Sequence, residues 1–112
     1  MAKLNRTRQA ILQVATNLFL EKGYNVVATY EKNHEAARLV AEETGAEAIC
    51  CDVADRQAVL AAFQKVGPVD LLICNAGICH TGLLSMMEEA DWDRLFAVNV
   101  KGIYNCVSGA MP

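Results

Sequence analysis

The sequence lacks the features that mark several large classes of protein. Its 112 residues contain no apolar run long enough to span a bilayer, so we expect no membrane anchor. The basic residues at the start are not followed by an uninterrupted apolar segment, so we expect no secretion signal. A net charge of −3 gives no general attraction to nucleic acid or an anionic membrane, and we expect neither as a partner. The 54% of hydrophobic and 21% of charged residues exclude a disordered chain and are typical of one globular domain.

No C-x-x-C pair occurs among the five cysteines, which argues against a zinc site. Cys50 and Cys51 are adjacent, so on a strand their side chains point to opposite faces and do not easily share one ion. Cys74, Cys79 and His80 are the nearest approach to a set of metal ligands. An odd number of cysteines without a secretion signal predicts reduced thiols in a cytoplasmic protein, and we expect no metal.

The pattern of apolar residues predicts an α/β fold in which helices alternate with short strands. Each expected helix ends near a glycine, except the last, which runs up to one. The expected helices cover residues 5–22, 33–44, 55–66 and 89–109, and the expected strands cover residues 25–30, 48–53 and 69–74. Because the segment 69–74 is apolar on both faces, we expect a buried parallel sheet of about three strands flanked by helices.

Asn99 is the sharpest single clue to a site. It interrupts an apolar stripe on the last predicted helix, so we expect it on the buried face. The stripe consists of Trp92, Leu95, Phe96, Ile103, Cys106 and Val107. An unpaired buried amide costs about 1–3 kcal/mol, so the side chain needs a partner. From the residues alone, a core asparagine bonded to a loop carbonyl is the simpler interpretation.

The third predicted strand runs into Asn75-Ala76-Gly77, and the segment Val98-Asn99-Val100-Lys101-Gly102 follows on a helix. Together with the preceding Val-Asp-Leu-Leu-Ile, this combination resembles the middle of a short-chain dehydrogenase/reductase. The resemblance implies a Rossmann-type fold and hydride transfer between a nicotinamide and a carbonyl or alcohol substrate. Among subfamilies, the sequence is most similar to the bacterial 3-oxoacyl-(acyl-carrier-protein) reductases.

The resemblance also implies roles for the matching residues. Asn99 matches the asparagine that loosens its helix and holds a water in the proton relay of that family. Asn75, Ala76 and Gly77 match the turn that stabilises the central sheet and passes close to the cofactor ribose. From the residues alone, an ordinary turn explains the same tripeptide equally simply.

Two further positions match the cofactor site of the family. Asp52 and Val53 match the Asp-Val pair that contacts the adenine ring, although a carboxylate at a strand end is an equal alternative. An acidic residue at the end of the preceding strand bonds the ribose of NAD. Tyr30 occupies that place and Lys32 follows it, which favours NADP, whereas Glu31 argues for caution.

Two motifs of the family have no match in the sequence. No glycine precedes Gly23, so the glycine-rich phosphate loop is missing, and Tyr24, Tyr30 and Tyr104 do not begin a Tyr-x-x-x-Lys motif. The resemblance covers residues 10–112. We therefore expect residues 1–112 to form a single, incomplete Rossmann-type domain without the glycine-rich front end and the catalytic C-terminal half. We expect this chain to bind NADP or NAD weakly if at all, and to show little turnover alone.

Two alternatives come from other classes of protein. A non-catalytic interaction module fits the missing motifs, and self-association through open sheet edges would follow from missing strands. Residues 5–24 also resemble the first helix of TetR-type repressors, but residues 25–54 then read as strand, helix and strand and provide no recognition helix. In a monomer we expect the strand order 48–53, then 25–30, then 69–74.

Overall fold

The computed structural model describes residues 14–111, and these residues belong to two compact units that meet after Cys50. We describe each unit by itself. The predicted helix over residues 5–22 is seen as helical residues 14–21, and its earlier part lies outside the described residues. Of the segment 5–24, which resembles a repressor helix, residues 5–13 likewise lie outside the described residues.

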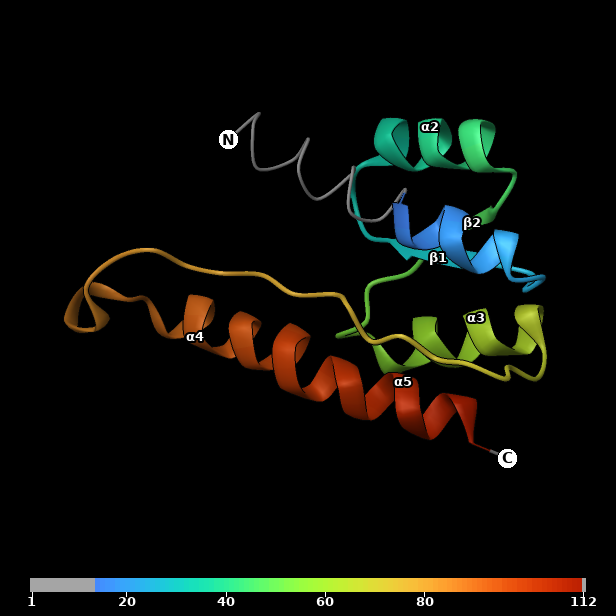
Figure 1. Ribbon diagram of the computed structural model, residues 1–112. Coiled ribbons are helices and arrows are strands. Elements are labelled where there is room, and N and C mark those ends of the chain that lie inside the picture. The colour runs from blue at the N-terminus through green and yellow to red at the C-terminus, as the bar shows by residue number, and fades with distance from the viewer. Residues whose placement is uncertain (1–13, 112) are drawn as a thin grey trace. The chain divides into compact units, whose positions relative to one another are not determined.

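The first unit contains a parallel pair of strands joined by a helix (Figure 1). Its elements are β1 (Val27–Tyr30), α2 (His34–Thr44) and β2 (Glu47–Cys50). The pairing runs from Val27 opposite Glu47 to Tyr30 opposite Cys50. Short runs of valine, threonine and tyrosine favour such strands, and the helical crossover is the connection that parallel strands require.

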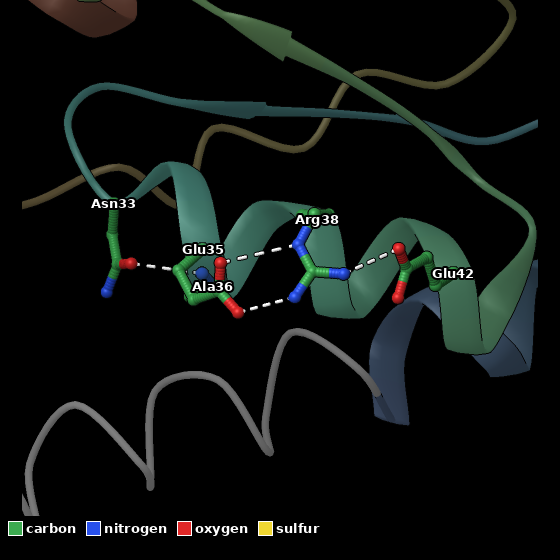
Figure 2. A network of polar contacts seen from close by, with 5 residues as sticks. All are labelled: Asn33, Glu35, Ala36, Arg38 and Glu42. Atoms are coloured by element: carbon green, nitrogen blue, oxygen red, sulfur yellow. Dashed lines mark hydrogen bonds and ion pairs between the residues drawn. The ribbon is translucent and has the colours of Figure 1, made fainter.

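Polar contacts stabilise α2 at both ends and along its exposed side. The Asn33 side chain accepts the backbone N–H of Ala36 at 3.0 Å, and Arg38 bonds both Glu35 and Glu42 (Figure 2). The hydrogen bond and charge of Arg38 lower the pKa of the Glu35 carboxyl. Gly45 ends the helix with φ 78°, a left-handed conformation that glycine adopts without strain.

The second unit is built from helices. Its elements are α3 (Arg56–Val66), the short 3₁₀ turn η1 (Leu84–Met86), α4 (Glu89–Phe96), the π turn η2 (Ala97–Lys101) and α5 (Gly102–Ala110). The last three form one continuous helix, as predicted for residues 89–109 (Figure 1). Asp55 caps α3 by accepting the N–H groups of Gln57 and Ala58. A Cβ on Gly109 would lie 2.8 Å from the Phe63 ring, so this glycine allows α5 to approach α3 closely.

The predicted third strand is wrong. Residues 69–74 form neither helix nor strand in the structure, and the sheet seen among residues 14–111 has two strands, β1 and β2. Leu71 and Ile73 are 49% and 56% exposed, whereas the prediction placed them in a buried sheet. The physical reason is that a strand exists only through hydrogen bonds to a neighbour, and this extended segment has none among the described strands.

The buried face of the long helix also differs from the prediction. Trp92, Phe96, Ile103 and Val107 are exposed, whereas Val98, Gly102 and Asn105 are buried. The π turn accommodates one residue more than an α-turn and shifts the face that follows it. The periodicity of a regular α-helix therefore fails for Ile103 and Val107, which follow the π turn, whereas the exposure of Trp92 and Phe96 before it has no such cause. Among the described residues, no helix is long and apolar enough to cross a membrane.

Candidate functional site

Asn99 lies in the π turn η2 and binds the loop that follows the Asn-Ala-Gly segment. Its Nδ2 donates to the carbonyl oxygen of Ile78 at 2.9 Å, and its Oδ1 accepts the N–H of Ile78 at 2.9 Å. A Cβ on Gly77 would lie 3.5 Å from the same Oδ1. The side chain is part-buried, and both ends of its amide are satisfied by one residue. This geometry is that of an asparagine bonded to a loop, and the proton-relay role stays a prediction.

Asp52 is the predicted adenine contact, and its carboxylate is fixed on both sides. Its Oδ1 accepts the backbone N–H of Ala54 at 3.0 Å, and its Oδ2 accepts Nη1 of Arg94 at 2.9 Å. The side chains of Asp52 and Arg94 are 32% and 36% exposed, so the pair is only partly removed from water. A charge-assisted bond to a donor of fixed shape orients the carboxylate.

Val53 is held by the same continuous helix. Its carbonyl oxygen accepts Nδ2 of Asn105 at 2.8 Å, and its Cγ2 lies 2.7 Å from where a Cβ on Gly102 would stand. Any larger residue at position 102 would therefore displace Val53. The sequence interpretation missed Arg94, Gly102 and Asn105. The available signal was Asn105, a polar residue inside the apolar run of the last helix.

Tyr30 and Lys32 lie in the first unit, at the end of β1 and just beyond it. The hydroxyl of Tyr30 is hydrogen-bonded to Nδ1 of His34 at 3.0 Å, and the two rings meet edge to face. Nζ of Lys32 lies 3.9 Å from a carboxylate oxygen of Glu31, and its side chain is 84% exposed. An exposed ion pair of this kind holds Lys32 weakly, so its ammonium is accessible to an anionic ligand.

The structure thus brings the predicted residues together in separate groups. Within the second unit, Asn99 meets Gly77, and the neighbours of Asp52 and Val53 stand on the same helix as Asn99. Asn75 and Ala76 are exposed in the extended segment. Tyr30 and Lys32 belong to the first unit, which is described on its own.

Three of the four cysteines of the second unit, Cys51, Cys74 and Cys106, have thiols that interact with one another. Cys51 is buried, and Cys106 is partly buried near Cys74. Burial, followed by the charges and hydrogen bonding of the neighbouring thiols, raises the pKa of Cys106 to about 11. His80 has Nδ1 at 3.9 Å from Oδ2 of Asp91. The part of the chain that the structure describes contains no group of three or more side chains suited to hold a metal ion.

Comparisons with known proteins identify relatives along almost the whole chain. The 3-oxoacyl-(acyl-carrier-protein) reductase FabG of Staphylococcus aureus is 39% identical over 114 aligned positions, which cover 94% of this chain and 44% of the relative. The crystal structure of BdcA in complex with NADPH, a protein of E. coli, matches with a TM-score of 0.80 and 38% identity. A gluconate 5-dehydrogenase from Burkholderia cenocepacia in complex with NADP and tartrate matches with a TM-score of 0.71 and 32% identity.

These matches cover most of this chain but only part of each relative. The two structures are matched over 88% of this chain and over 41% and 42% of their own lengths. The chain therefore spans less than half the length of the relatives it matches. The family model described as short chain dehydrogenase matches residues 9–112. On this evidence, and with the partial α/β fold that the resemblance predicted, the chain belongs to the short chain dehydrogenase family.

Proposed function

We propose that this chain supplies the adenosine side of a nicotinamide-cofactor site in an oxidoreductase of its family. The observation that carries the proposal is the Asp52 carboxylate, which is accessible to ligand but fixed by Ala54 and Arg94. A carboxylate accepts hydrogen bonds only, and the exocyclic amine of adenine donates them. Relatives with NADPH or NADP bound support a cofactor of the same class here.

We propose the remaining cofactor contacts from the family positions that these residues match in the sequence. Val53 lies against the adenine ring, and the backbone of Asn75, Ala76 and Gly77 passes the ribose. Tyr30 and Lys32 receive the 2′-phosphate of NADP, because the Lys32 ammonium is exposed beside the end of β1. NAD is the alternative cofactor, since Glu31 provides the kind of acidic side chain that bonds a ribose hydroxyl.

The reaction that we propose is hydride transfer between the nicotinamide and a carbonyl or alcohol group of a small-molecule substrate. Asn99 would hold a water of the proton relay through its own backbone while its amide binds Ile78. The sequence supplies no Tyr-x-x-x-Lys, so no positioned donor protonates the carbonyl oxygen. We therefore propose one incomplete Rossmann-type domain, located in the cytoplasm, with little turnover of its own.

Titration of the chain with NADPH, followed by NMR of the backbone amides, tests the cofactor site. We expect saturable shifts at Asp52, Val53 and Ala54, with an affinity weaker than the low micromolar range because no glycine-rich loop contacts the pyrophosphate. Lys32→Met should weaken the binding of NADPH more than the binding of NADH. Lys65→Met removes a cation from the exposed end of α3 and serves as the charge control. Shifts that spread without saturation would contradict the proposal.

A second candidate function is a non-catalytic interaction module. The observation that favours it is the extended segment 69–74, in which Leu71, Leu72 and Ile73 are each more than one-third exposed. An extended segment with exposed apolar side chains and unpaired backbone groups can pair with a strand of another chain. A second copy of this chain is the simplest partner, and neither nucleic acid nor a membrane is needed to explain the surface.

A further inference from the structure

The extended segment that contains Cys74 lies along the continuous helix of the second unit and runs in the opposite direction (Figure 1). At one point, the backbone of Ile78 binds the side chain of Asn99 through two hydrogen bonds of 2.9 Å. At a second point, the thiol of Cys74 is close enough to form a hydrogen bond with the thiol of Cys106 in α5. These two contacts set the register of the segment on the helix.

The spacing of the two contacts agrees with this register. From Cys74 to Ile78 the chain advances by four positions, which cover about 13 Å in an extended chain. From Asn99 to Cys106 it advances by seven positions, which cover about 11 Å in a helix. The path of the segment therefore brings Cys74 to Cys106 once Ile78 is bound to Asn99, and the thiol contact does not depend on the orientation of one side chain alone.

The two thiols differ in their access to solvent. Cys74 is exposed, whereas Cys106 is partly buried, and burial is the largest cause that raises the pKa of Cys106 to about 11. At neutral pH Cys106 keeps its proton and reacts slowly with an oxidant in solution, since the thiolate is the nucleophile. Cys51 also interacts with Cys106, but it is buried and shielded from solutes. Cys74 is thus the accessible thiol, with Cys106 next to it.

We infer that Cys74 and Cys106 form a peroxide-sensitive dithiol site, in which hydrogen peroxide converts the two thiols into an intramolecular disulfide. In the first step the Cys74 thiolate attacks one peroxide oxygen, the O–O bond breaks, and Cys74 becomes a sulfenic acid while the second oxygen leaves as water. In the second step the Cys106 sulfur attacks the Cys74 sulfur. The S–S bond forms, the S–O bond breaks, and the departing hydroxide takes the Cys106 proton and leaves as water. The two thiols together lose two electrons, and the peroxide is reduced to water.

The disulfide would change how the Asn75-Ala76-Gly77 turn is held. Cys74 directly precedes this turn and Ile78 directly follows it. In the reduced chain, hydrogen bonds from Asn99 hold the end at Ile78, and a thiol contact holds the end at Cys74. Oxidation replaces the thiol contact with a covalent bond, so both ends of the turn become fixed to the long helix. The dithiol site is independent of the proposed cofactor site.

Oxidation of the dilute, reduced chain with hydrogen peroxide, followed by alkylation of the remaining thiols and mass spectrometry, tests the site. We expect monomeric chains that have lost two of the five free thiols and carry a crosslink between Cys74 and Cys106. Dithiothreitol should restore all five thiols. The oxidised chain should melt several degrees higher, because a disulfide restricts the unfolded chain. A chain without this crosslink, or with Cys51 joined to Cys106 in its place, would overturn the inference.

Two cysteine variants separate the steps of the reaction. Cys106→Ala removes the second thiol, so Cys74 should stop at the sulfenic acid, which dimedone traps, and its disulfide should be lost. Cys79→Ala is the matched control, since it removes another exposed cysteine of the same loop. It should leave both the rate and the position of the crosslink unchanged. Loss of the crosslink in Cys79→Ala would assign the reaction to the wrong pair and overturn the inference.

Oxidation of the natural chain in concentrated urea gives a control that does not depend on the folding of any variant. In an unfolded chain, loop closure favours cysteines that are close in sequence, such as Cys74 and Cys79. We therefore expect the crosslink between Cys74 and Cys106 to dominate under native conditions and to become a minor product in urea. The same distribution of disulfides under both conditions would show that the fold does not bring the two thiols together, and would overturn the inference.

Discussion

Asn99 binds both the N–H and the C=O of Ile78, so its amide acts as a short strand partner for a single residue of the loop. Two hydrogen bonds to the backbone of the same residue fix the position and the direction of the chain there. The loop immediately follows Gly77, where the resemblance places the cofactor ribose. Position 99 thus connects the long helix to the segment in which we propose cofactor binding.

Replacing Asn99 with leucine should destabilise the chain by about 1–3 kcal/mol, because the part-buried N–H and C=O groups of Ile78 both lose their hydrogen-bond partner. Asn99→Asp keeps an acceptor for the Ile78 N–H but cannot donate to its carbonyl oxygen, so we expect an intermediate loss. Denaturant unfolding measures both changes. The nearby exposed Val100 provides the control, and Val100→Thr should have little effect. Equal stabilities of Asn99→Leu and the natural chain would contradict this account.

The Cys106 thiol should make stability depend on alkaline pH. Its pKa in the folded chain is raised from 9.0 to about 11, so the folded state keeps a proton that the unfolded state loses. The contribution of this group is therefore complete below pH 9.0 and is lost as pH rises towards about 11. Denaturation at several alkaline pH values should show a smaller decline for Cys106→Ala than for Cys79→Ala, an exposed cysteine. An identical decline in both variants would contradict the prediction.

For single residues, the sequence predicted the hydrogen-bond partner of Asn99 but not the contacts of Arg94 and Asn105 on the same helix. A polar residue in an apolar helix needs a partner, and the structure provides a loop backbone, as the simpler interpretation proposed. The roles of Arg94 and Asn105 depend on Asp52 and Val53, which lie more than forty residues earlier in the chain. Neither helical periodicity nor local motifs carry information on contacts that distant. The contacts of Arg94 and Asn105 with Asp52 and Val53 therefore became visible only in three dimensions.

Among the elements, the helices and the first two strands formed close to where local patterns predicted them, whereas the third strand did not form. Asn33 and Asp55 cap α2 and α3, and Gly45 and Gly67 end them close to the predicted boundaries, because capping depends on residues a few positions apart. The segment 69–74 has the composition of a buried strand, but composition cannot supply a hydrogen-bonded neighbour. The resemblance implied a loosened helix at Asn99, where the π turn lies, but helical periodicity alone could not predict it.

The cap of α3 offers a direct test at the scale of one element. Asp55→Ala removes the acceptor for the N–H groups of Gln57 and Ala58, and we expect a loss of about 1 kcal/mol. Asp55→Asn should restore most of it, since asparagine caps almost as well. Thermal unfolding followed by circular dichroism gives the measurement. Asp93→Ala, which removes an exposed carboxylate from within α4, is the control and should change stability less.

For the molecule as a whole, stability and association should depend on a small core and a large exposed apolar surface. Among residues 14–111, the buried hydrophobic residues are few and small, and they are Val40, Ala46, Cys51, Val59 and Val98. Many larger apolar side chains are exposed, among them Leu71, Ile73, Leu84 and Met86. Small cores provide little net stability, and large exposed apolar patches are typical of surfaces that bind another chain. We therefore expect marginal stability together with self-association.

A concentration series by light scattering or sedimentation tests the expected self-association, and paired variants locate its surface. Leu71→Lys with Ile73→Lys places two charges on one side of the extended segment, because alternate residues of an extended chain share a side. This double variant should shift the population towards monomer, since charges oppose edge pairing. Leu84→Lys with Met86→Lys removes similar exposed apolar surface from η1 and should leave association unchanged. Equal effects of the two double variants would indicate non-specific association.

A monodisperse natural chain with a sharp melt above about 65 °C would contradict both self-association and the incomplete domain, because ordinary mesophilic domains melt below that temperature.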